Sequence, residues 1–99
     1  MSDAPRLQEV FVGDYLLAFD GRVLEFFNTN AGFNRIHIAH MRLKVREGRK
    51  GRLMVEVTAR RRNTPREIFE AQPEERPAFE GMIADIRGAA ESAGVEIAS

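Results

Sequence analysis

The spacing of apolar residues changes once along the chain. Between about residues 14 and 71, apolar positions recur mainly at every second residue, as in strands with one buried face. After that region the spacing becomes three and four, which is typical of an amphipathic helix. The residues with helical spacing are Phe79, Met82, Ile83, Ile86, Ala90 and Ala93. The pattern predicts five to seven strands followed by one helix over about residues 74–93.

The strongest local signal is Asp20-Gly21 between two apolar runs. An Asp-Gly pair in this position predicts a two-residue type I′ turn, because both central residues of that turn need a positive φ. The turn would place Leu17 opposite Leu24. The face predicted to be buried consists of Tyr15, Leu17, Phe19, Leu24 and Phe26. The other face also carries apolar residues, namely Leu16, Ala18, Val23 and Phe27, so we expect part of it to be covered.

The next extended segment changes phase midway. Ile36 and Ile38 share one face, whereas Met41 and Leu43 share the other. A regular strand cannot bury both sets in one core, because its side chains alternate between the two faces. We therefore predict a bulge or corner near residues 39–40, where the sheet folds over on itself.

Two further strands are predicted before the helix. A turn over residues 47–51 precedes an alternating strand over residues 53–59. A short strand over residues 66–71 follows, with Ile68 facing the core and the side of Phe69 left open. Gly94 is the predicted glycine just beyond the helix.

These elements predict an α+β fold that is mainly β. We expect a strongly bent antiparallel sheet, or partly open barrel, capped by the C-terminal helix. Residues 1–6 are expected to form a flexible tail and residues 7–99 a single domain, since 99 residues can build only one core. The chain has no cysteine, no apolar run long enough for a membrane helix and an acidic N-terminus without an apolar signal core, so we expect a cytoplasmic protein.

The order of these elements resembles the pleckstrin-homology-like superfamily, in particular its short bacterial pleckstrin-homology-type and GRAM-like domains. The residues that carry the resemblance are the runs 15–26 and 35–40 and the helix from Phe79. The resemblance implies a curled, nearly orthogonal sheet plugged by a helix, and a binding module instead of an enzyme. Phosphoinositide-binding members have basic residues in the first hairpin loop, whereas Asp20-Gly21 is acidic. We therefore transfer no binding residue from the family.

Charge is divided unevenly along the chain although the net charge is zero. Residues 1–34 carry −3, residues 35–66 carry +9 and residues 67–99 carry −6. The basic third is a candidate anion-binding patch. Its members are Arg42, Lys44, Arg46, Arg49, Lys50, Arg52, Arg60 and Arg62. The alternative is neutralisation within the fold by the acidic residues Glu74, Glu75 and Glu80.

No set of residues predicts catalysis, a metal site or a cofactor. His37 and His40 would point to opposite faces of a regular strand, and the chain lacks the cysteines of common zinc sites. No nucleophile elbow or phosphate-binding loop is present. We therefore expect a non-enzymatic module that binds a protein partner or a second copy of itself. An anionic membrane surface or another phosphate ligand on the basic patch is the alternative. Nucleic acid is a weaker one, because only Phe33 provides an aromatic ring near the patch.

Overall fold

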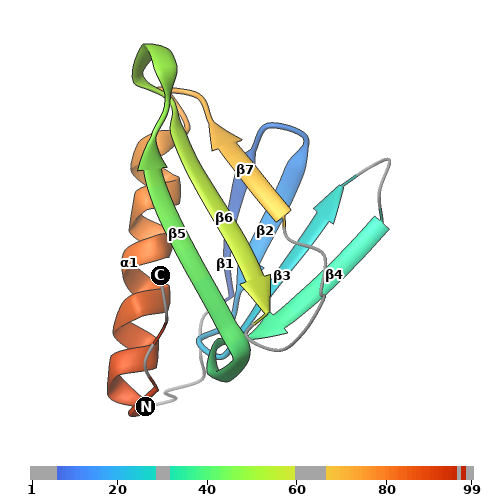
Figure 1. Cartoon of the computed structure of the whole chain (residues 1–99). Helices are drawn as coiled ribbons and strands as arrows, with labels where there is room; N and C mark the ends of the chain where they lie inside the picture. The colour runs from blue at the N-terminus through green and yellow to red at the C-terminus, as the bar shows by residue number, and fades with distance from the viewer. Residues whose placement is uncertain (1–6, 29–31, 60–66, 96, 98–99) are drawn as a thin grey trace.

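A computed structural model describes residues 7–28, 32–59, 67–95 and 97 of the chain. The described strands form two antiparallel sheets, and one helix follows them (Figure 1). This confirms the expected α+β, mainly β, class. The four-stranded and three-stranded sheets are separate units and do not close into one barrel. The predicted tail over residues 1–6 lies outside the described residues.

Each sheet is a meander in chain order. The first sheet contains β1 (Gln8–Val12), β2 (Tyr15–Phe19), β3 (Val23–Asn28) and β4 (Gly32–His37). The second contains β5 (Met41–Glu47), β6 (Leu53–Ala59) and β7 (Glu67–Ala71). The helix α1 spans Arg76–Ser92. β1 lies before the region in which alternation predicted strands.

The β2–β3 hairpin has a wider loop than Asp20-Gly21 predicts. Phe19 pairs with Leu24, two positions away from the predicted register. The Asp20 carboxylate accepts hydrogen bonds from the backbone N–H groups two and three residues later, at 2.9 and 2.8 Å. This side-chain turn replaces the two-residue loop, and within the loop only Gly21 has a positive φ, of 100°. A shift of two residues preserves the faces, so the predicted inward residues do face the core.

The predicted corner is present as a short 3₁₀ turn, η1 (Ile38–His40). The backbone N–H of Ile38 donates to the carbonyl of Arg22 at 2.8 Å, and Nδ1 of His37 accepts the N–H of Ala39 at 3.0 Å. The turn carries the chain from the first sheet to the second. Ile38 at the start of the corner and Met41 after it are therefore both buried in one core.

The prediction that Ile68 faces the core was wrong. Ile68 is 41% exposed, whereas Phe69 is 1% exposed. The cause is the pairing with β6, in which Phe69 lies opposite the buried Val55 and Ile68 lies opposite the outward Glu56. Phe69 then makes edge-to-face contacts with two rings of the first sheet, Tyr15 and Phe26, and with Phe79 of the helix.

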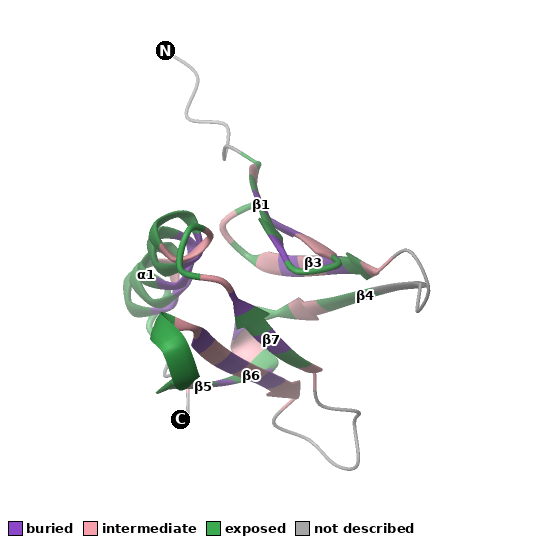
Figure 2. Cartoon of the chain, turned by 90° about the horizontal axis from the view of Figure 1, so that it is seen from above, coloured by how far each residue is buried: buried purple, intermediate pink, exposed green. Residues whose placement is uncertain are grey.

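The helix closes one side of the space between the two sheets (Figure 2). It begins at Arg76, two residues later than predicted, because the N–H of Glu75 bonds the carbonyl of Gln72 in a preceding turn. Its buried residues are Phe79, Met82, Ile83, Ile86 and Ala90. Ala93, predicted to be buried, is instead the exposed C-terminal cap. Gly94 follows with a φ of 72°, as predicted.

Candidate functional site

Three members of the predicted anion patch form a row on the second sheet. Arg42, Lys44 and Arg46 are exposed on the outer face of β5, at every second position. None of the three forms an ion pair with another described residue. A hollow of about 170 Å³ lies beside Arg42 and Lys44 and also contains Glu56. The row is therefore basic, but a carboxylate interrupts the face beside it.

The other members of the patch are not part of this row. Arg49 and Lys50 are exposed at the tip of the β5–β6 hairpin, in the 3₁₀ turn η2 (Arg49–Gly51). Arg52 is half-buried, and its guanidinium lies 3.7 Å from the carboxylate of Glu70. Arg60 and Arg62 lie outside the described residues.

Two of the carboxylates expected to neutralise this patch contact other groups. Glu75 accepts hydrogen bonds from the backbone N–H groups of Gly13 and Gln72, and so joins the β1–β2 turn to the start of α1. Glu80 lies 2.9 Å from the guanidinium of Arg76. The described contacts thus tie these two carboxylates to groups that are not members of the β5 row.

Arg76 links the helix to the β5–β6 hairpin. Its guanidinium donates two hydrogen bonds of 2.8 Å to the Glu47 carboxylate and one of 3.1 Å to the carbonyl of Gly51. The hydrogen bond from Arg76 lowers the pKa of Glu47. Hydrogen bonds to the carboxylates of Glu47 and Glu80 raise the pKa of Arg76. This bidentate pair holds two elements together, because a planar guanidinium matches a carboxylate in two places.

The two histidines lie close together at the corner, with ring centroids 6.2 Å apart. Nδ1 of His37 is engaged as the acceptor that caps η1. Among the described residues, no group of three or more histidine, cysteine or acidic side chains is placed to hold a metal ion. His37 therefore helps to organise the corner between the sheets.

An apolar row crosses the outer face of the first sheet. Phe11 pairs with Leu16, and Leu16 pairs with Phe27, so these three residues are neighbours on adjacent strands. Phe11 is 69% exposed and Phe27 is 37% exposed. A hollow of about 370 Å³, lined mainly by apolar surface, lies over them. We refer to Phe11, Leu16 and Phe27 as the apolar row.

Sequence reasoning identified only part of this row. The sequence places Leu16 and Phe27 on the second face of the predicted hairpin, part of which we expect to be covered, and it assigns Phe11 to no face. The register of β1 with β2 is what places Phe11 beside Leu16. The described part of the chain leaves Phe11 largely uncovered.

A polar row runs beside the apolar one on the same face. It consists, from β1 to β4, of Glu9, Ala18, Glu25 and Arg35. Ala18 is buried, and Glu25 and Arg35 form an ion pair of 4.0 Å. The outer face of the first sheet therefore carries one apolar row and one polar row, and each row crosses the strands from β1 towards β4.

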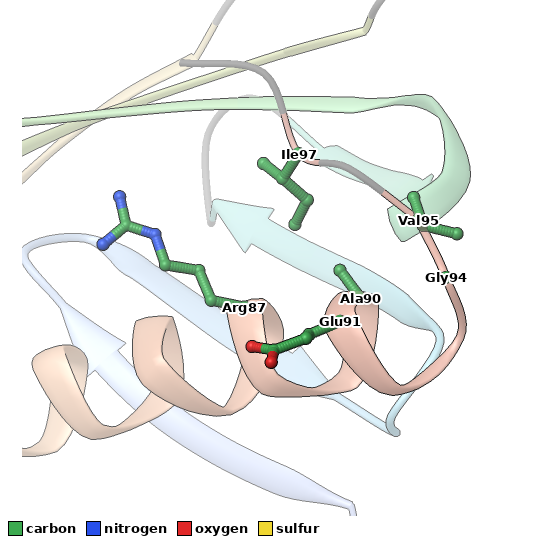
Figure 3. A pocket seen from close by; sticks show the side chains of 6 residues that line it. All are labelled: Arg87, Ala90, Glu91, Gly94, Val95 and Ile97. Atoms are coloured by element: carbon green, nitrogen blue, oxygen red, sulfur yellow. The ribbon is translucent and has the colours of Figure 1, made fainter.

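Other hollows lack such an arrangement. One of about 490 Å³ lies where Leu7, Asp20 and Asp85 meet, between the start of β1, the β2–β3 loop and the helix. Another of about 440 Å³ lies at the end of α1, where Figure 3 shows Ile97 beside the last turns of the helix and Arg87 and Glu91 projecting from it. Neither brings together groups that would suit a defined chemistry.

Comparison of the chain with family models, curated proteins and solved structures finds no match. Within the described ranges, no helix combines the length and the apolar character that crossing a membrane requires.

Proposed function

We propose that this chain is a non-enzymatic, pleckstrin-homology-like binding module of the cytoplasm that contacts another polypeptide through the apolar row. The observation that carries the proposal is the exposure of Phe11 beside Leu16 and Phe27. Two antiparallel sheets whose strands cross, followed by a closing helix, support the family likeness (Figure 1). In this proposal the two sheets are the halves of a partly open barrel.

The apolar row has the properties of a binding surface. Aromatic side chains, phenylalanine included, are enriched at protein interfaces relative to the rest of the protein surface. Burying a phenylalanine side chain fully stabilises by roughly 1.5–3 kcal/mol. Part of that stabilisation is still available at Phe11 and Phe27, since both remain exposed in the isolated chain. A partner with apolar side chains would gain it by covering the row.

The proposal is tested by selecting displayed random peptides on the folded, immobilised chain. We expect enriched peptides to be apolar and to lose binding at least tenfold on the double variant Phe11→Ser/Phe27→Ser. Ile68→Ser is the matched control, because Ile68 is similarly exposed but lies on the other sheet. Peptides that bind the double variant as well as the original chain would overturn the proposal, as would no enrichment at all.

The second candidate is an anionic surface bound by the β5 row. The observation that favours it is that Arg42, Lys44 and Arg46 are exposed without an ion pair to a described residue. Their spacing of about 6.6–6.8 Å places three cations along one strand. Nucleic acid has less support, since no aromatic residue of the described strands shares this outer face.

Sedimentation with vesicles tests this second candidate. At low salt, the chain should sediment with vesicles that contain an acidic phospholipid and not with neutral ones. Arg42→Gln/Lys44→Gln should abolish most of the sedimented fraction, whereas Arg87→Gln on the exposed side of the helix should leave it nearly unchanged. Absence of sedimentation at low salt would exclude a membrane surface as the ligand.

A further inference from the structure

We propose that the polypeptide bound by the apolar row is a second copy of this chain, packed face to face about a twofold axis. This inference rests on the proposed function and names its partner. It follows from the order of residues in the two rows of the first sheet. The apolar row is Phe11, Leu16 and Phe27 on β1, β2 and β3, and the polar row has Glu9 on β1 and Arg35 on β4.

A twofold axis that lies between the copies and parallel to the strands has a simple consequence. It keeps each row opposite the same row of the second copy, and it reverses the order of the strands. β2 of one copy then lies opposite β3 of the other, so Leu16 meets Phe27 of the second copy. The apolar rows cover each other, as the inner faces of a β-sandwich do at a separation of about 10 Å.

The charged row is also complementary under this operation. β1 of one copy lies opposite β4 of the other, so Glu9 faces Arg35 of the second copy, and the contact occurs twice. Glu25 faces the small Ala18 of the second copy, not another carboxylate. The row carries two carboxylates, Glu9 and Glu25, and one guanidinium, Arg35. In this arrangement no carboxylate of one copy faces a carboxylate of the other.

The other in-plane axis is excluded by the same residues. An axis perpendicular to the strands would exchange the two rows and place Glu9 against Phe11 of the second copy. Packing a carboxylate against an aromatic ring removes its water without providing a counter-charge, which is costly. The distribution of residues therefore selects one of the two arrangements.

The area of the outer face of the first sheet sets the expected affinity of the dimer. Four strands spaced about 4.8 Å apart and about 20 Å long cover roughly 400 Å² of flat area. This is below the roughly 800 Å² per partner of a standard interface. We therefore expect a reversible dimer with a dissociation constant of about 10–100 µM, populated only at high concentration or when another interaction brings copies together.

The test is a charge-exchange cycle read by sedimentation equilibrium at several loading concentrations. Glu9→Lys and Arg35→Glu should each weaken the dimer about five- to tenfold, because each creates two like-charge contacts. The double variant Glu9→Lys/Arg35→Glu should restore the affinity to within about twofold of the original. Arg87→Glu, a charge change on the exposed side of the helix, is the control and should leave the dimer unchanged. Thermal unfolding of each variant confirms that the compared chains are folded.

The outcomes separate this inference from the proposed function. A chain that stays monomeric up to millimolar concentration, or a double variant no stronger than the single ones, overturns the twofold dimer. If displayed peptides still select the apolar row in that case, the binding function stands and its partner is a different protein. If the row selects no peptide but the charge cycle holds, binding of other polypeptides is overturned and the row serves self-association alone.

Discussion

Tyr15 is the only tyrosine of the chain, which contains no tryptophan, so its titration is observed without interference. Its hydroxyl donates a 2.7 Å hydrogen bond to Oε2 of Glu67, and its ring lies 4.8 Å from that of Phe69. These contacts join β2 of the first sheet to β7 of the second. A single residue therefore reports on the contact between the sheets.

The hydrogen bond to Glu67, with burial and the charge of that carboxylate, raises the pKa of Tyr15 above its usual value of 10.0. A raised pKa means that the bond stabilises the fold fully below pH 10.0 and that this contribution is lost as the pH rises through the folded-state pKa. Glu67→Gln keeps an acceptor and removes the charge, so the tyrosinate absorbance should then appear closer to pH 10.0. Glu70→Gln, a control on the same strand, should not move it, and an equal shift in both variants would contradict the assignment.

At the scale of the element, α1 is held by its buried stripe and its C-terminal end, not by its glycines. Gly81 and Gly88 lie on the exposed side, and a methyl group added at either would meet no atom within 4 Å. Gly94 is different, because its φ of 72° is a conformation that other residues adopt only with strain. The N–H of Val95 bonds the carbonyl of Ala90 at 2.8 Å and completes the helix end.

Gly81→Ala and Gly88→Ala should therefore each raise the free energy of unfolding by about 0.5–1 kcal/mol, because alanine loses less backbone entropy in a helix. The two effects should add, since the sites are two turns apart. Gly94→Ala should lower it by about 1 kcal/mol. Urea denaturation measures all three, and destabilisation by the first two would mean that these glycines are needed for close packing.

The Glu47–Arg76 pair connects the hairpin of the second sheet to the helix. Because Arg76 lowers the pKa of Glu47, the pair stabilises the fold above about pH 4.5, the ordinary value for this carboxyl, and this contribution disappears as the pH falls through the lowered pKa. Arg76→Met should make the urea midpoint less dependent on pH in the acidic range. Arg87→Met on the same helix should keep the original pH profile. A flattened profile in Arg87→Met as well would show that the Glu47–Arg76 pair does not cause the pH dependence.

At the scale of the whole molecule, Phe69 is the residue on which the layers converge. Its ring contacts Tyr15 and Phe26 of the first sheet and Phe79 of the helix, while its strand belongs to the second sheet. Removing it would leave a cavity bounded by all three units. Its neighbour Ile68 points to solvent and has no such role.

Phe69→Ala should lower the free energy of unfolding by about 3–5 kcal/mol, whereas Ile68→Ala should change it by no more than about 0.5 kcal/mol. A loss of that size is a large share of the stability of a small domain, so Phe69→Leu provides a milder variant that should still fold. Chemical denaturation compares the three. Equal effects at the two positions would contradict the orientation of β7 in which Phe69 faces the core and Ile68 faces solvent.

The local pattern of residues determined which positions face inward along most of the chain. Leu17, Phe19, Leu24 and Phe26 are buried as predicted even though the hairpin register was wrong, because a shift of two residues leaves the faces of a strand unchanged. The phase change between Ile38 and Met41 predicted the corner, because a regular strand cannot direct both residues into one core. The helix stripe is equally local, since it depends only on the spacing of its own residues.

Tertiary structure decided what depends on neighbouring strands. Ile68 and Phe69 are both apolar, and only the pairing of β7 with β6 determines which of them is buried. The separation of the strands into two sheets depends on topology, and so do the partners of Glu75 and Glu80, which are not members of the Arg42–Arg46 row. The apolar row has the same origin. Phe11 and Phe27 are sixteen positions apart in the chain, and they lie on one face only because Leu16 pairs with both.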